Sequence, residues 1–371
     1  MRSKEPYTLF KRPTKNGKAV YYYQYRKDDG TRSTAKSTGC TTLASARLFC
    51  NRLYNSGEFK KDSQLKFSVY VKDFFSESSI YYLWKVSNKQ HISKETLLAY
   101  NKFLRNQLLP FFENYIVTEI KRTDVKMWVI WANEKWSPKT VNNAQTVLNI
   151  IFKQAIDDDL IETNPCYNIS FRDVPKKQRD LLTIEEVKAI YNSDKWWYDN
   201  KLIFLLDVVT GMRISEVVAL KNENVFENYI QVVHSYSRKF GLGNTKTYLN
   251  RYVPIPEELS KKLYFERDFL FINRKGKNKG NPLNITTFND NLRIVYESLG
   301  INRKERNLNV HTNRNFFISY LQSENVPEAK IRAVVGHKDS TMTGLYTYWK
   351  PEMFPEVYEA QKKLYDFITR G

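Results

Sequence analysis

Residues 311–346 read HTNRNFFISYLQSENVPEAKIRAVVGHKDSTMTGLY and contain two of the four histidines of the chain. His311 and Arg314 are three residues apart, so on a helix their side chains share one face. Phe317 and Leu321 follow with helical spacing and form an apolar stripe. The pattern predicts a helix that begins near His311 and packs against a core through this stripe.

A second helix is expected to begin at Pro327, because proline is favoured in the first turn of a helix. It is expected to end at Gly336, since glycine suits a helix C-terminus, and His337 follows at once. Ser340 is a candidate N-cap for a third, short helix that would present Tyr346. The stretch therefore supplies an arginine, two histidines and a tyrosine from closely connected elements.

These side chains suit chemistry at a phosphate. Arg314 offers a planar fork of donors that matches phosphate oxygens. The two histidines can donate hydrogen bonds to a phosphoryl group and move protons near neutral pH. Tyr346 is a candidate nucleophile if nearby cations or a base favour its phenolate, because the ordinary tyrosine pKa is about 10. The chain has 25 tyrosines, so a plain packing role for Tyr346 stays open.

The composition indicates a polyanionic partner. The 371 residues include 59 Lys+Arg against 40 Asp+Glu, a formal net charge of +19. Such a partner is nucleic acid or an anionic membrane surface, and nucleic acid is favoured over a mere surface excess of charge because +19 is high. No apolar run approaches the roughly 18 residues of a membrane span. The first residues lack the apolar core of a signal peptide. Cys40, Cys50 and Cys166 form neither a CxxC pair nor an even set, which indicates a reducing cytoplasm and no zinc or other metal site.

Residues 1–57 are predicted to form a small basic domain. Strands rich in aromatic and β-branched residues are expected at 8–13, 19–27 and 31–38, with hairpin turns at Asn16-Gly17 and Asp28–Gly30 and a helix from Thr42. A basic sheet of this kind can read duplex DNA in the major groove. The candidate DNA contacts are Lys11, Arg12, Arg26, Lys27 and Arg32. A basic but inert sheet is the alternative.

Residues 65–170 are predicted to form a domain of four or five helices. Ser93 is a candidate N-cap, Pro110 is expected to end a helix, and Thr123 is expected to cap the next one. The last helix opens at Ser137-Pro138. Near its start lie three candidate phosphate contacts, because backbone N–H groups at a helix N-terminus favour anions: Lys139, Thr140 and Asn142.

Residues 171–181 are basic, contain proline and lack an apolar stripe, so they are interpreted as a linker to a last domain over 182–371.

In this last domain a long apolar helix is expected to end near Val209. Arg213 would open the next helix, with Glu216 placed to pair with it and fix its direction. A purely structural ion pair is the alternative. Lys246 is expected on or beside a β-hairpin, as surface decoration or as an acid for a leaving 5′-oxygen.

Taken together, these residues resemble the tyrosine recombinase, or phage integrase, family. The resemblance is carried by an ordered set: Arg213 in TGMRISEV, Lys246 in TKT…RYVPIP, His311 and Arg314 in HTNR, His337 in VVGHKD, and Tyr346 nine residues later. The basic sheet is similar to the arm-binding domain of integrases, and the helical domain to their core-binding domain. This layout favours an integrase of a phage or conjugative element.

The resemblance implies roles for the set. Arg213 and Arg314 would clamp the scissile phosphate, Lys246 would be the general acid, and His311 and His337 would assist as donors. Tyr346 would attack to give a 3′-phosphotyrosyl link and a free 5′-hydroxyl, with no ATP, metal or other cofactor. One departure is Tyr348, which stands where relatives often have histidine and is ranked below Tyr346 as the nucleophile.

The resemblance also implies fold and partners. The expected fold is multi-domain and mainly α with small β-sheets: a three-stranded sheet plus helix, a helical core-binding domain, and an α+β catalytic domain. Expected partners are double-stranded DNA at core and arm sites, a homo-tetramer on DNA, a host DNA-bending protein and an excisionase, in a bacterial cytoplasm. A helix after Pro351 would dock on a neighbouring subunit or on its own domain. A type IB topoisomerase and a non-catalytic DNA-binding regulator are the competing functions.

Overall fold

The computed structural model describes residues 7–13, 19–26, 32–55, 65–90, 92–174, 180–245, 250–265, 267–337 and 350–370. The chain divides into two compact units, Met1–Pro175 and Lys176–Gly371. The division falls inside the segment 171–181, whose described residues form neither helix nor strand. Its role as a linker stays a prediction. A further boundary between residues 57 and 65 stays a prediction.

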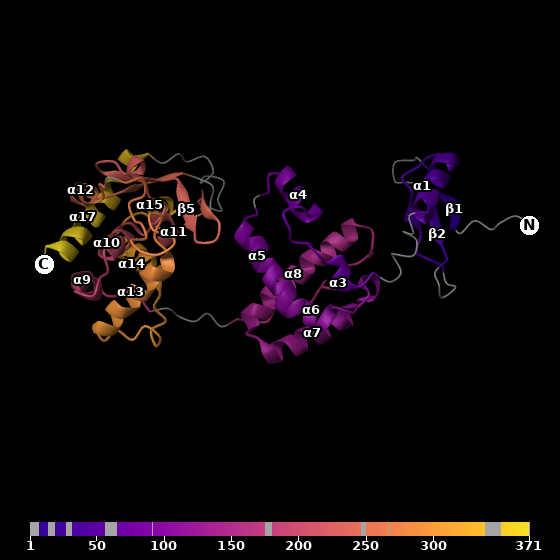
Figure 1. Ribbon diagram of the computed structural model, residues 1–371, viewed down its shortest axis with the longest axis horizontal. Coiled ribbons are helices and arrows are strands. Elements are labelled where there is room, and N and C mark those ends of the chain that lie inside the picture. The colour runs from indigo at the N-terminus through magenta and orange to yellow at the C-terminus, as the bar shows by residue number, and fades with distance from the viewer. Residues whose placement is uncertain are drawn as a thin grey trace, which may run out of the picture. The chain divides into compact units, whose positions relative to one another are not determined.

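The N-terminal part of the first unit is a three-stranded antiparallel sheet, as predicted. The strands are β1 (Tyr7–Pro13), β2 (Ala19–Tyr25) and β3 (Lys36–Ser37), in the order β1-β2-β3. Helix α1 (Leu43–Asn55) packs on β1 and β2 (Figure 1). Tyr23 and Cys50 belong to the buried cluster between them. Ala46 and Cys50 of α1 are fully buried, whereas Leu43 and Phe49 are exposed. The predicted turns at 16–17 and 28–30 lie outside the described residues.

The rest of the first unit is helical. Its elements are α3 (Phe67–Tyr70), α4 (Ile80–Ser87), α5 (Lys94–Phe103), the π-helical η1 (Leu104–Leu108), α6 (Leu109–Phe112), the 3-10 turn η2 (Val117–Glu119), α7 (Arg122–Lys135) and α8 (Pro138–Asp157). Ser93 and Ser137 cap α5 and α8, as predicted. The predicted stop at Pro110 is wrong: a π-helical turn precedes it and places it in the first turn of α6, where its missing N–H costs nothing. Thr123 is also not a cap, since α7 begins at Arg122.

In the second unit, the described helices and two small sheets surround one large apolar core. The elements are α9 (Ile184–Asn192), α10 (Asn200–Thr210), α11 (Ile214–Val217), η3 (Asn222–Asn224), β4 (Tyr229–Val232), β5 (His234–Ser237), β6 (Gly241–Asn244), β7 (Arg251–Pro254), α12 (Glu257–Lys262), α13 (Ile285–Ser298), α14 (Val310–Ser323), α15 (Glu328–Val335), η4 (Pro351–Met353) and α17 (Pro355–Thr369). Strand β4 pairs with β7, and β5 pairs with β6. Among the described residues, no helix has the length and apolar character needed to cross a bilayer.

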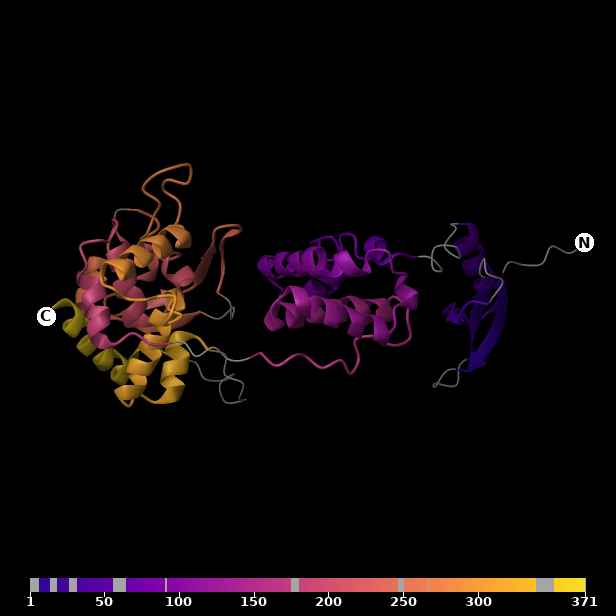
Figure 2. The ribbon, with the colours of Figure 1, turned by 90° about the horizontal axis from the view of Figure 1, so that it is seen from below.

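The C-terminal helix α17 packs within its own unit. It contacts α9, α10 and β7, and Figure 2 shows it in yellow at the C-terminal end of the second unit. Val357, Leu364 and Ile368 are fully buried. Gln361 donates from Nε2 to the carbonyl of Val209 at 3.0 Å, near the end of α10. The apolar face of α17 is therefore covered in the same chain, and of the two arrangements expected for this helix the structure has the intramolecular one.

Candidate active site

Arg213 sits where a helix break and a new helix start meet. α10 ends at Thr210, and Gly211 takes the left-handed conformation at φ 59° that a glycine adopts without strain. Arg213 is the N-cap residue of α11, and its backbone N–H donates to Glu216 Oε2 at 2.9 Å. Its Nη1 donates to Glu216 Oε1 at 2.8 Å. The predicted pairing of these two residues is thus present, and both backbone and side chain fix it.

Glu216 is shared with a second arginine that the sequence interpretation missed. Arg251, at the start of β7, donates from Nη1 to Oε1 at 3.2 Å and from Nη2 to Oε2 at 2.6 Å. The Glu216 side chain is only 1% exposed. Burial alone would raise the pKa of Glu216, but the charges of Arg251 and Arg213 outweigh it and hold this pKa below its ordinary value. The carboxylate therefore stays ionised between two cations.

Arg314 is buried on α14 and 2% exposed. It donates from Nη1 to the carbonyl of Gly211 at 2.7 Å and from Nη2 to the carbonyl of Val335 at 2.5 Å. Burial, and then the charges of Arg213 and Arg251, lower the pKa of Arg314 to about 10. Its surroundings thus disfavour the charge that it carries at neutral pH, which is a common property of functional sites.

The C-terminal end of α15 gathers all three arginines. Three consecutive carbonyls there, of Val334, Val335 and Gly336, accept in turn from Arg251 Nε at 2.7 Å, Arg314 Nη2 at 2.5 Å and Arg213 Nη2 at 3.2 Å. The last carbonyls of a helix have no partner within it and carry partial negative charge, so they attract cations. The three guanidinium groups therefore lie side by side on neighbouring peptide units.

His337 follows this helix end directly. Gly336 is left-handed at φ 70°, and the His337 backbone N–H donates to the carbonyl of Arg332 at 3.0 Å. Partial burial and the charges of Arg314, Arg213, Arg332 and His311 lower the pKa of His337 from its ordinary value. His311 is exposed in the first turn of α14, where its backbone N–H donates to Asn309 Oδ1.

The structure thus brings together five of the residues selected from the sequence: Arg213, Glu216, His311, Arg314 and His337. Lys246 and Tyr346 lie outside the described residues, as does Lys27.

The remaining candidates are DNA contacts of the first unit. Lys11 and Arg12 are exposed on β1, where Lys11 lies over the Tyr21 ring and Arg12 over the rings of Phe10 and Tyr22. Arg26 and Arg32 are exposed and face each other in a β-bridge.

Lys139 is exposed at the start of α8, and the Thr140 backbone N–H is taken by Ser137 Oγ. Asn142 exchanges two hydrogen bonds with the backbone of Arg172, at 2.8 and 3.1 Å, so its amide braces the start of the linker. Contact of any of these residues with DNA stays a prediction.

Among the residues that the structure describes, two buried charged ones were not selected from the sequence as site residues. One is Arg251. The other is Asp207 on α10, which accepts from Asn313 Nδ2 at 2.9 Å and whose pKa burial raises to about 7. The available signal was a charged residue inside an apolar pattern, LIFLLDVV for Asp207 and RYVPIP for Arg251. That signal identifies a buried charge but not its partner.

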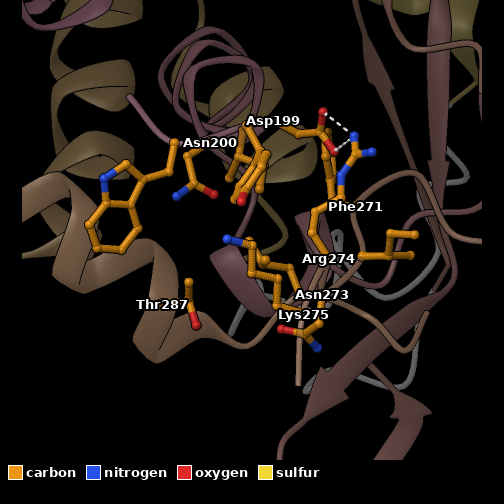
Figure 3. Close-up of a pocket in the computed structure, with 12 residues that line it drawn as sticks. Asp199, Asn200, Phe271, Asn273, Arg274, Lys275 and Thr287 are labelled. Atoms are coloured by element: carbon orange, nitrogen blue, oxygen red, sulfur yellow. Dashed lines mark hydrogen bonds and ion pairs between the residues drawn. The ribbon is translucent and has the colours of Figure 1, made fainter. Parts of the chain in front are cut away.

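A pocket of about 240 Å³ lies elsewhere in the second unit. Its lining includes Trp197, Phe271 and Lys275, and Arg274 makes an ion pair with Asp199 at its edge (Figure 3). None of the residues selected from the sequence lines it. The arginine cluster, which consists of Arg213, Arg251 and Arg314, is therefore a separate site. It is built on helix ends and backbone carbonyls rather than around this pocket.

Replacing Gly211, whose carbonyl accepts a hydrogen bond from Arg314, is expected to destabilise the fold beneath the arginine cluster. In Gly211→Ala the new Cβ would lie 2.3 Å from Phe317 Cδ1, and the left-handed backbone would also be strained. We expect a loss of about 2–4 kcal/mol in the free energy of unfolding, measured by urea denaturation of the full chain. Gly300→Ala is the matched control, because Gly300 is also left-handed but has nothing within 4 Å of the added Cβ. Equal losses in the two variants would contradict a packing role for Gly211.

Comparisons with known proteins place the chain in a family. The profile described as "Phage integrase family" matches residues 180–352, and "Phage integrase, N-terminal SAM-like domain" matches residues 78–130. Together they cover more than half of the chain. The prophage ps2 probable integrase of Lactococcus lactis subsp. lactis is 26% identical over 395 residues, which span 94% of this chain and 98% of that protein.

Two solved structures share the fold. The Tn1549 transposon integrase in complex with transposon right end DNA matches with a TM-score of 0.59 at 20% identity, over 76% of this chain and 98% of that one. A lambda integrase tetramer bound to a Holliday junction matches with a TM-score of 0.55 at 17% identity, over 95% and 100%. The expected multi-domain fold is thereby confirmed. The chain belongs to the phage integrase family of tyrosine recombinases, site-specific enzymes that cut and rejoin DNA strands.

Proposed function

We propose that the arginine cluster is the site where a DNA phosphodiester is cut and rejoined to integrate and excise a mobile element. The observation that carries the proposal is an excess of positive charge. In the described part of the chain, Arg213, Arg251 and Arg314 meet at one helix end, and the ionised Glu216 pairs with the first two of them. Asp207 is close in space, but its raised pKa of about 7 makes it a weak counter-charge. A phosphate oxygen supplies the missing anion.

The two predicted phosphate ligands differ in access. The Arg213 side chain is 20% exposed and uses one nitrogen on Glu216 and one on a carbonyl, so its other N–H groups can meet a phosphate at the surface. Arg314 is buried and would reach the same phosphate only after the residues that cover it move. Its two hydrogen bonds to backbone carbonyls fix the guanidinium before DNA binds. Such preorganised charge is what stabilises a transition state strongly.

The two histidines would complete the donor set. Because the pKa of His337 is lowered, its imidazole is mostly neutral at pH 7 and has one N–H to donate and one nitrogen to accept. A bound phosphate would offset the surrounding positive charge and raise that pKa again. His337 can therefore both donate to a phosphoryl oxygen and take the phenol proton as the tyrosine attacks.

The covalent step rests on two residues outside the described part of the chain. The Tyr346 phenol oxygen would bond to phosphorus while the bond from phosphorus to the 5′-oxygen breaks, and Lys246 would give that oxygen its proton. The product is a 3′-phosphotyrosyl link and a free 5′-hydroxyl. Attack by a partner strand's 5′-hydroxyl reverses the step, so the bond energy is kept and no ATP is consumed. The cationic cluster supplies the stabilisation that a metal ion gives in other phosphoryl transfers.

The first unit would hold the DNA. The exposed cations of residues 1–57 would contact an arm site, with Lys11, Arg12, Arg26, Lys27 and Arg32 as ligands. Residues 65–170 would hold the core site, with Lys139 and Thr140 near a phosphate, and residues 182–371 would carry the catalysis. As for the lambda integrase tetramer on a Holliday junction, four copies would assemble on DNA. A host DNA-bending protein and an excisionase would set the direction of the reaction.

The test is covalent capture on a nicked suicide duplex built from the DNA that flanks the gene. Cleavage beside the nick releases a short 5′-hydroxyl fragment that diffuses away, so rejoining fails and the protein–DNA link accumulates. We expect a labelled complex that survives denaturing electrophoresis and forms with EDTA present and no ATP. Failure to capture any candidate core, with DNA binding intact, would favour a non-catalytic regulator. Relaxation of plasmids without recombination between paired sites would favour a topoisomerase.

A further inference from the structure

Arg251 has a position that the proposed roles of the cluster leave unexplained. It lies at the start of β7 with 9% of its side chain exposed, deeper than Arg213 at 20%. Its guanidinium donates to Glu216 from both terminal nitrogens and to the Val334 carbonyl from Nε. An added Cβ on Gly336 would lie 3.1 Å from Arg251 Nε, so the two residues are packed in close contact. All three guanidinium nitrogens of Arg251 thus have protein partners, and two of them bind the Glu216 carboxylate, whereas the bonds of Arg314 go to uncharged carbonyls. The placement of Arg251 therefore serves Glu216 rather than DNA.

Glu216 poses a problem for a phosphate site. A carboxylate beside Arg213 competes with phosphate for the same guanidinium and repels the incoming anion. Paired with Arg213 alone, a buried Glu216 would cancel the charge that the substrate needs. With Arg251 added, the three side chains carry one net positive charge. Arg251 also takes the shorter bond to Oε2, at 2.6 Å, and leaves the Arg213 side chain a single contact with Oε1.

We propose that Arg251 is a positioning residue for strand cleavage: it offsets the charge of Glu216 and limits the hold of Glu216 on Arg213, so that Arg213 stays available to the scissile phosphate. Glu216 then orients Arg213 without neutralising it. The hydrogen bond from Arg251 to the Val334 carbonyl also fixes Arg251 to the end of α15, directly before His337. The inference rests on the proposed reaction of the cluster, and it adds a residue and a mechanism to it.

The test measures the single-turnover rate of covalent capture at saturating suicide duplex, beside duplex affinity and the melting temperature. We expect Arg251→Met to cleave about 10–100-fold more slowly, with affinity changed less than about threefold. Adding Glu216→Gln should restore the rate by about tenfold or more, because the carboxylate that captures Arg213 is gone. Arg251→Lys should retain most of the rate, since it keeps the charge while losing the fork.

A purely structural role for Arg251 predicts the opposite pattern. The double variant would then be as slow as Arg251→Met or slower, Arg251→Lys would be as impaired as Arg251→Met, and rates would follow melting temperatures. That result overturns the proposal. If Arg251→Met fails to fold, Arg251→Gln with and without Glu216→Gln gives the same comparison, because glutamine also removes the charge. A double variant as slow as Arg251→Gln alone would then overturn the proposal.

The matched control is Arg267→Met. Arg267 has the same chemistry away from the cluster: an ion pair with Asp199 at 2.9 Å, a bond from Nε to the Leu270 carbonyl at 3.0 Å, and 18% exposure. Its loss should lower stability and leave the capture rate near that of the unaltered protein. If the unaltered protein captures no DNA at all, the proposed function fails. If it captures DNA and the Arg251 variants match it, this inference alone fails.

Discussion

Tyr346→Phe is expected to abolish the covalent protein–DNA complex on the suicide duplex while leaving duplex affinity unchanged. The change removes one oxygen, the atom proposed to bond to phosphorus, and phenylalanine offers no substitute. Tyr346 follows His337 by nine residues, an interval of at most about 32 Å even for a fully extended chain, so the sequence keeps this phenol within that distance of His337 in the same chain. Denaturing electrophoresis measures the complex, and a gel-shift assay measures affinity.

Tyr348→Phe is the matched control, because it removes the same atom two residues away. It should capture DNA at a rate within about threefold of the unaltered protein, since only the interval to Tyr346 fits the family pattern. Loss of capture in Tyr348→Phe with retention in Tyr346→Phe would reverse the assignment of the nucleophile. Digestion of the captured complex and identification of the modified peptide gives an independent answer.

Arg314→Met is expected to reduce the capture rate by about 10²–10³-fold at saturating DNA. Methionine fills much of the same volume, so the change removes mainly the charge and the two donated bonds to Gly211 and Val335. Arg314→Lys keeps the charge, but its single ammonium lacks the planar fork that joins these two carbonyls, so it should rescue only partly.

The control for this prediction is Arg293→Met on α13. Arg293 is exposed and pairs loosely with Glu297 at 4.0 Å, so its loss should change neither the capture rate nor the fold. Circular dichroism of all variants checks that each is folded. A rate for Arg314→Met within about threefold of the unaltered protein would show that Arg314 is a core arginine with no part in the reaction.

Local chemistry explains why much of this protein was predictable. The Arg213–Glu216 pair follows from a three-residue spacing at a helix start, and the ends of α15 follow from Pro327 and Gly336. These features depend on neighbours in sequence, where spacing fixes geometry. Pro110 shows the limit of such rules, because a preceding π-helical turn makes room for a residue that ordinarily ends a helix.

By itself, the sequence determined the family and the basic DNA-binding character, and it supplied the candidate residues for the chemistry, because these depend on residue type, order and short intervals. Only the tertiary structure decided that Arg251, Arg314 and Arg213 bind three consecutive carbonyls and that α17 is packed in its own unit. The partners of Arg251 at Val334 and Glu216 lie 83 and 35 residues away. Such contacts form when whole elements pack, and no periodic pattern along the chain encodes which buried charge meets which carbonyl.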